Sequence, residues 1–412
     1  MPTSQNFTAY YEDRVRQYLN FFCEMLPSRS VGTAGNRDAT DFFKHRLMDF
    51  GWSTEETPFV ATDWRTDGAT LICGTLAFDV QSSPFSLGCS VCGQLIEVDS
   101  IEKLEQSDLA GKIVLLHGSL AAEPLMPKNF EFYNPDEHKR ILTAFEKSGV
   151  SAIITATARH SALAGGVYPF PMIEDGDFNI PSVFMTEEEG KRLRACCGHP
   201  VRLDSIATRI PSVGCNVTGR KGNHSGKRIV ITAHIDAKMG TPGAIDNATG
   251  VIVLLLLAER LKNVSFSERT IELLAINGED YYAVPGQMAF LNENKNKFEN
   301  IAVNINIDCA GYYEGKTAVS LFDLPSELHK IAMNLIDRND ELTEGMPWFQ
   351  GDHTLFLQNG IPAIVFASDW FLKHIETQSI THTPKDTPQI VDGKKIAIIA
   401  ETIESLLLAM ER

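Results

Sequence analysis

Histidine and aspartate side chains are grouped in the segment ITAHIDAKMGTPGAIDNATG, residues 231–250. His234 and Asp236 end one apolar run, and Asp246 precedes the apolar run that begins at Val251. Imidazole nitrogen together with carboxylate oxygen suits zinc, whereas calcium and magnesium favour oxygen ligands. The segment therefore predicts a site for zinc or another divalent transition metal.

Further ionisable residues follow other apolar runs. Glu279 and Asp280 come after TIELLAING, Asp308 ends NIAVNINID, and His382 lies in the loop SITHTPKDTPQ. Functional groups collect beyond the carboxyl ends of strands in sheets of this type, so we expect these residues to share one crevice. Carboxylates crowded into one crevice repel one another unless cations lie among them. Because one carboxylate can bridge two ions, a two-metal hydrolytic site is predicted, with Asp246 as the bridge.

Some of these residues also have simpler explanations. Asp236 lies on the same strand face as His234 and is expected to hold one nitrogen of its imidazole. Taken alone, Asp246 could instead cap the following helix, and His382 could be an ordinary loop residue. Asp352, in GDHTLF, is expected to serve as a helix cap or, as the alternative, to support the site from behind. The joint pattern favours the metal site.

The elements that must position these residues alternate along the chain. Two helical patterns open it, and strand-like and helical runs alternate from residue 206 onward, which predicts an α/β fold with a mixed, largely parallel sheet covered by helices on both faces. Residues 62–205 instead hold short apolar runs between Gly, Pro and Ser clusters. We therefore predict one domain from 1–61 and 206–412, interrupted by a small α/β domain at 62–205.

Composition narrows the function classes. The 412 residues are 43% hydrophobic, and 53 acidic against 37 basic residues give a formal charge of −16. This charge argues against nucleic acid as a partner. The longest apolar run, 251–258, is far below the roughly 18 residues that a membrane span needs. The first residues lack the pattern of a secretory signal, so a cytoplasmic location is expected. The sequence does not define an oligomeric state.

The ordered set of motifs resembles the M28 family of zinc peptidases. Besides H-x-D with GAIDNATG, it comprises RSVGTAGNRDA, NGED, NIDCAG, and DHTLFLQNGIPA followed by HTPKDT. The inserted block, with DLAGKIVLL and GVSAII, resembles a protease-associated domain. These stretches are distributed over most of the chain. The resemblance implies a zinc-exopeptidase fold and an aminopeptidase that acts on peptides or amino-acid derivatives.

The resemblance also implies a role for each candidate residue. His234 and Asp308 would complete one zinc site, Asp280 and His382 the other, and Asp246 would be shared by two zinc ions. Glu279 would be the general base, which takes a proton from water and passes it to the leaving amine.

The chain departs from the family pattern at three places. Asp280 replaces the usual glutamate, the loop after it carries one extra residue in YYAVPGQ, and Thr381 stands where an aromatic residue is common. These departures bear on substrate choice and rate. The alternatives are a dipeptidase, an amidohydrolase or a single-zinc enzyme of the glutaminyl-cyclase type on the same fold, and a binding relative without catalysis. The last two should have lost metal ligands, and every expected ligand position here carries a competent side chain.

Overall fold

The chain forms two compact units in the computed structural model, which describes residues 4–26, 28–159 and 167–411. The first unit is Met1–Ala61 with Val213–Arg412, and the second is Thr62–Ser212. The chain passes between them within two long strands, β1 (Ser53–Cys73) and β8 (Pro200–Gly222).

The sheet of the first unit is mixed and largely parallel. Its strands, besides the end of β8, are β9 (Lys227–His234), β10 (Arg269–Ile276), β11 (Ile301–Ile307), β12 (Thr317–Phe322), β13 (Leu342–Glu344) and β14 (Ala363–Ser368). They lie in the order β13-β12-β14-β11-β9-β10-β8. The central neighbours β14, β11, β9 and β10 are all parallel, while β12 and β8 run antiparallel to their neighbours β14 and β10. The expected fold class is therefore confirmed.

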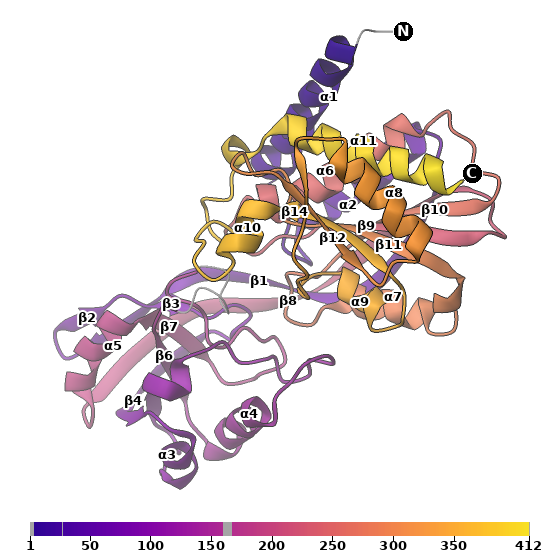
Figure 1. Ribbon diagram of the computed structural model, residues 1–412. Coiled ribbons are helices and arrows are strands. Elements are labelled where there is room, and N and C mark those ends of the chain that lie inside the picture. The colour runs from indigo at the N-terminus through magenta and orange to yellow at the C-terminus, as the bar shows by residue number, and fades with distance from the viewer. Residues whose placement is uncertain (1–3, 27, 160–166, 412) are drawn as a thin grey trace. The chain divides into compact units, whose positions relative to one another are not determined.

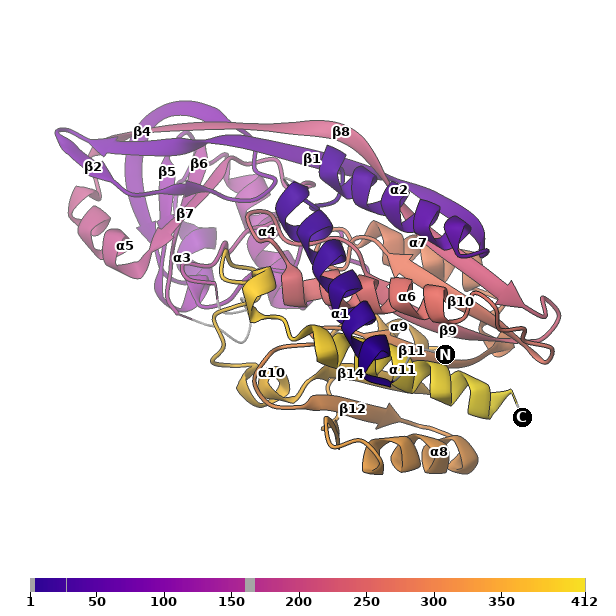
Figure 2. The ribbon, with the colours of Figure 1, turned by 90° about the horizontal axis from the view of Figure 1, so that it is seen from above.

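Helices cover both faces of this sheet. They are α1 (Ser4–Leu19), α2 (Ala34–Asp49), α6 (Thr249–Arg260), α7 (Pro285–Asn294), α8 (Ser326–Asp337), α9 (His353–Leu357), α10 (Asp369–His374) and α11 (Gly393–Met410), with short turns η1 (Asn20–Met25), η4 (Ala244–Ala248), η5 (Phe298–Asn300) and η6 (Pro388–Ile390). Helices α1, α2 and α11 pack against α6 on one face, where α8 packs against α11, and α7 and α9 lie on the other face (Figures 1 and 2). Residues 249–259 of α6 are all buried because the helix is apolar on every side.

The second unit has its own sheet and its own core. Its elements are β2 (Leu76–Phe78), β3 (Gln81–Ser82), β4 (Cys89–Val98), β5 (Ile113–Leu116), β6 (Ala152–Thr157), β7 (Ser182–Thr186), α3 (Ile101–Gln106), α4 (Asp136–Ser148), α5 (Glu187–Leu193), η2 (Gly118–Ala121) and η3 (Arg194–Cys196). The order is β8-β4-β5-β6-β7-β3. Alternate residues of β5 enter two different apolar clusters, so this sheet is buried on both faces.

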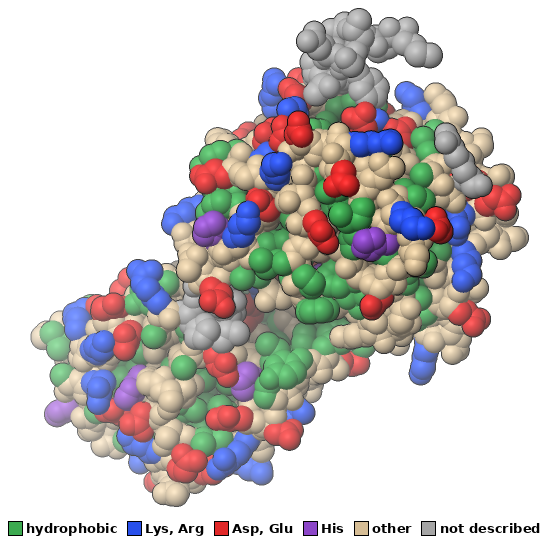
Figure 3. Space-filling model, in the orientation of Figure 1, with side chains coloured by type: hydrophobic (Ala, Val, Ile, Leu, Met, Phe, Trp, Pro, Cys, Tyr) green, Lys and Arg blue, Asp and Glu red, His purple; other side chains and the backbone are tan. Residues whose placement is uncertain are grey.

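Charged side chains of both signs are interspersed over the face drawn in Figure 3. Within the described part of the chain, every helix is too short or too polar to cross a bilayer.

The close packing of α6 on the sheet predicts an asymmetry between two glycines. A Cβ on Gly250 would lie 2.7 Å from the Ile307 carbonyl oxygen and 2.9 Å from Ala233 Cβ. A Cβ on Gly393, at the start of α11, would meet only ordinary contacts at 3.6 Å or more. We therefore expect Gly250→Ala to lower the free energy of unfolding by about 1–3 kcal/mol through overpacking, although alanine is the better helix former.

Gly393→Ala is the matched control and should leave that free energy unchanged or slightly higher. Urea unfolding followed by circular dichroism measures both variants. Equal stability of the two would contradict the packing argument.

Candidate metal centre

The candidate residues meet at one edge of the sheet of the first unit. Strand β9 ends at His234, β10 leads into Glu279 and Asp280, and β11 leads into Asp308. Because these three strands are adjacent and parallel, their carboxyl ends lie side by side. His382, in the loop before η6, completes the group.

Asp246 lies between the two histidines. Its Oδ1 is 3.0 Å from Nε2 of His234, and its Oδ2 is 3.1 Å from Nε2 of His382. The same nitrogen of His234 is 3.6 Å from Asp308 Oδ1, and that of His382 is 3.1 Å from Asp280 Oδ1. The structure therefore brings all five expected ligands together, in two sets that share one carboxylate.

Several of these donor atoms lack a hydrogen bond. His234 Nε2, Asp280 Oδ2 and Asp308 Oδ1 are buried and have no hydrogen-bond partner. His234 Nε2 therefore lies close to the carboxylates of Asp246 and Asp308, but the geometry of neither contact is that of a hydrogen bond. Ligand atoms lie within 4.8 Å of one another in the set of His234, Asp246 and Asp308, and likewise in the set of Asp246, Asp280 and His382. Unpaired buried donors and acceptors are costly, and nitrogen and carboxylate ligands in this arrangement fit zinc or a similar ion.

The charges in the centre are strongly coupled. Burial opposes protonation of His234, but the carboxylates of Asp236, Asp246 and Asp308 outweigh it and raise its pKa well above the usual value. Burial raises the pKa of Glu279 well above its usual value, and the charges of neighbouring carboxylates add to this shift. Both shifts arise from carboxylates crowded in a buried place, and a cation would compete with protons for the same groups.

Asp236 lies near His234, as expected, but makes different hydrogen bonds. Its Oδ1 lies 3.7 Å from Nδ1 of His234, which is too long for a hydrogen bond. Its carboxylate instead accepts the backbone N–H groups of Gly278 at 2.7 Å, Glu279 at 3.3 Å and Asp280 at 3.0 Å. Asp236 therefore fixes the loop that carries the expected base and one ligand.

Two N-terminal residues also hold the loops of the centre. The buried Arg29 donates to the carbonyl oxygens of Ile235 at 3.2 Å and of Gly243 at 2.7 Å. Asn36 and Asn277 exchange two side-chain hydrogen bonds of 2.9 Å. Sequence reasoning gave these residues no role, and the available signal was an arginine and an asparagine within the small-residue segment 29–39.

Asp352 does not cap helix α9. It stands at the cap position without a capping hydrogen bond, and its Oδ1 accepts from Gln287 Nε2 at 2.8 Å. Burial raises the pKa of Asp352 to about 7, and the charges of Asp308 and Asp236 add to the shift. The expectation of a helix cap is therefore wrong, and the alternative of a buried group behind the site describes it better.

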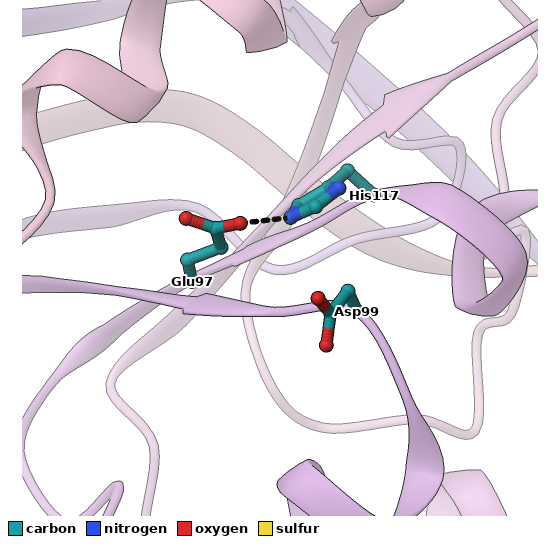
Figure 4. A group of neighbouring side chains, drawn as sticks. All are labelled: Glu97, Asp99 and His117. Atoms are coloured by element: carbon teal, nitrogen blue, oxygen red, sulfur yellow. Dashed lines mark hydrogen bonds and ion pairs between the residues drawn. The ribbon is translucent and has the colours of Figure 1, made fainter.

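A second group of metal-ligand types occurs in the other unit. Glu97 lies near the end of β4, Asp99 comes just after this strand, and His117 comes just after β5 (Figure 4). Glu97 Oε1 is 2.7 Å from His117 Nε2 and 2.8 Å from Arg194 Nη2, and Asp99 faces Lys103 at 3.6 Å. These ion pairs already balance both carboxylates, so the group does not require a cation.

Gly351 leaves room for Asp308. Its φ is +98°, and a Cβ there would lie 2.7 Å from Asp308 Oδ2. We expect Gly351→Ala to displace that carboxylate and to weaken zinc binding about 10–100-fold, the usual effect of disturbing groups that orient a ligand. Competition with a chromogenic chelator measures the affinity.

Gly360→Ala is the matched control, because Gly360 has a φ of +74° but open space around its Cβ position. It imposes similar backbone strain without the clash. Zinc affinity that falls equally in both variants would contradict the role of Gly351.

Solved aminopeptidase structures superimpose on almost the whole of this chain. The structure of an aminopeptidase from Aneurinibacillus sp. strain AM-1 superimposes with a TM-score of 0.74 at 19% identity, covering 96% of this chain and 93% of that one. The structure of BSAP, a zinc aminopeptidase from Bacillus subtilis, gives a TM-score of 0.72 at 19% identity, covering 97% and 94%. These likenesses show the same fold.

The relatives found by sequence are also named as aminopeptidases. Aminopeptidase YwaD of Bacillus subtilis strain 168 is 24% identical over 279 residues, which cover 63% of this chain and 58% of that protein. The chain spans just over half the length of the curated relatives it matches. The model of Peptidase family M28 matches residues 216–407, and all seven expected site residues lie in this range. Residues 216–407 are thus similar to peptidase family M28.

Proposed function

We propose that the protein is a metal-dependent aminopeptidase that uses two zinc ions. His234 and Asp308 would hold one ion, Asp280 and His382 the other, and Asp246 would be shared. The observation that carries this proposal is that each carboxylate oxygen of Asp246 faces a different histidine, at 3.0 and 3.1 Å. The relatives named above as aminopeptidases support the reaction, and the same set of ligands also suits another divalent transition metal.

Divalent ions at these positions would polarise the scissile carbonyl group and lower the pKa of water. Glu279 is suited to move the proton. One atom each of His234, Glu279 and Asp280 lies within 4.8 Å of the others, so Glu279 is close to the reaction centre. Burial and neighbouring carboxylates raise its pKa, which favours a group that accepts a proton and returns it to the leaving amine.

The relatives named as aminopeptidases favour a substrate with a free amino terminus. Beside the centre, Tyr312 contacts Trp370 and Phe371, with ring centroids 4.7 and 5.2 Å apart, in a cluster that also contains Ile245. Ile245, Tyr312 and Phe371 are buried, so this cluster packs next to the backbone that carries Asp246.

The presence of both ligand sets supports this activity over the single-zinc alternative. A cyclase-like site would leave one set incomplete, whereas both histidines and all of the expected carboxylates converge here. We further propose that Thr62–Ser212 is a protease-associated domain. Its support is the order of strands and helices and the separate core of that unit.

Replacement of Glu279 tests the proposed chemistry. Glu279→Gln should keep the zinc content of the wild type, because the side chain is not a proposed ligand. It should lower kcat/KM toward aminoacyl p-nitroanilides at least about a hundredfold, the usual scale for loss of a general base. Zinc content and turnover are measured on the same preparation.

Glu344→Gln, at an exposed position in β13, is the matched control and should change neither quantity. N-acetylated substrates should not be cleaved if a free amino terminus is required. Near-normal turnover of Glu279→Gln would remove this residue from the role, and cleavage of acetylated substrates would exclude an aminopeptidase.

A further inference from the structure

Three successive backbone N–H groups converge on Asp386. Ala244 N donates to the Asp386 backbone oxygen at 3.2 Å, Ile245 N to Oδ1 at 2.7 Å, and Asp246 N to Oδ2 at 3.0 Å. The Asp386 side chain is completely buried. Both of its carboxylate oxygens are therefore used to hold the backbone next to the shared ligand.

The segment 243–248 depends on this support because it is not a regular helix. Asp246 has φ −118° and ψ 87°, and Asn247 has φ −138° and ψ 44°, while α6 begins only at Thr249. N–H groups outside a regular helix need other acceptors, and consecutive ones form an anion-binding concavity. Here the anion is a side chain of the same protein. The alternative that Asp246 caps the following helix is accordingly wrong, because the cap position of α6 is Ala248.

Residues at both ends of the same segment are also held. Arg29 Nη2 donates to the carbonyl oxygen of Gly243 at 2.7 Å, and Asn247 Nδ2 donates to that of Ile307 at 2.9 Å. Asp246 thus lies between anchored neighbours, with its carboxylate directed at both histidines.

Asp386 belongs to the loop that carries His382, four residues earlier. One loop therefore supplies a histidine to the centre and also holds the carboxylate that faces this histidine. His382 itself has a φ of +59°, an unusual conformation for a residue other than glycine, which the surrounding loop must maintain.

We infer that Asp386 is a positioning residue of the metal centre. It presents both oxygens of Asp246 by fixing the backbone from Ala244 to Asp246, and it couples this segment to the His382 loop. Since Asp246 is shared, loss of this support weakens both ions together. This inference rests on the two-ion centre of the proposed function.

Asp175 provides a matched comparison in the other unit. It is 3% exposed, and its carboxylate also accepts two backbone N–H groups, from Lys128 and Asp177, each at 2.7 Å. It therefore makes the same kind of support without any proposed ligand nearby. If these carboxylates only stabilised the fold, replacing Asp386 and replacing Asp175 would affect the protein in the same way.

The test compares Asp386→Asn with Asp175→Asn in the full chain. The asparagine side chain can accept one of the two backbone N–H groups through its oxygen. Its NH₂ group would face the other N–H, and these two donors cannot form a hydrogen bond. We expect Asp386→Asn to weaken binding of both zinc ions about 10–100-fold, measured by chelator competition, and to alter the visible spectrum of the cobalt-loaded protein. Asp175→Asn should leave affinity and spectrum as in the wild type.

The outcomes separate this inference from the proposed function. If the wild type binds two ions and Asp386→Asn binds both with unchanged affinity, the positioning role is wrong and the two-ion centre stands. If the wild type binds no ion, the proposed function itself fails. Equal weakening by both variants would also overturn the inference, because it would indicate general destabilisation.

A measurement on the wild type covers the case in which Asp386→Asn does not fold. Because Asp386 holds the backbone before any ion binds, the amide hydrogens of Ala244, Ile245 and Asp246 should exchange slowly in zinc-free protein. Hydrogen exchange followed by mass spectrometry measures this. Fast exchange there, with slow exchange in the neighbouring helix α6, would overturn the inference.

Discussion

Repulsion among carboxylates at one edge of the sheet is the constraint on which the rest of the structure depends. Asp246, Glu279, Asp280 and Asp308 meet there, and among the described residues His234 and His382 are the histidines grouped with them. The carboxylates raise the pKa of both histidines well above the usual value, and burial with neighbouring carboxylates does the same for Glu279. Divalent ions would relieve the repulsion, because each brings two charges to atoms that lack hydrogen bonds. The carboxylates that repel one another at this edge of the sheet are thus also the groups suited to bind divalent ions.

The loops at this edge are fixed by charged side chains that are not proposed ligands. Asp236 holds the backbone of residues 278–280, Asp386 that of residues 244–246, and Arg29 the carbonyl oxygens of Ile235 and Gly243. Each uses strong, charge-assisted hydrogen bonds in a buried environment. A rigid frame of this kind lets the ligands stay close together despite their repulsion, which is the preorganisation that a metal site requires.

The sequence was sufficient to predict the fold class and much of the group of converging residues. Apolar runs predict strands, and the residues just after parallel strands must meet at one edge, whereas the place of His382 in the group was implied by the family resemblance. The supporting residues depend on contacts between distant segments, such as Arg29 with Gly243 and Asp386 with Asp246. No local pattern predicts those pairings, so the roles of Arg29 and Asp386 could not be predicted. Asp236 was placed near His234, but its bonds to the loop after β10 required the structure.

The long strands β1 and β8 could not be predicted either. They cross the expected boundaries at 61/62 and 205/206, where a change of composition suggested separate connections. Many residues of β1 are exposed and follow no sustained alternation of buried and exposed positions. The hydrophobic period that identifies a strand is therefore missing there, although the backbone is extended throughout.

The ratio of zinc to protein in the purified wild type tests the central claim most directly. It is measured by mass spectrometry after equilibration with zinc and removal of loosely bound ions. The shared position of Asp246 predicts close to two zinc ions per chain. A ratio of one or of zero would contradict the two-ion centre.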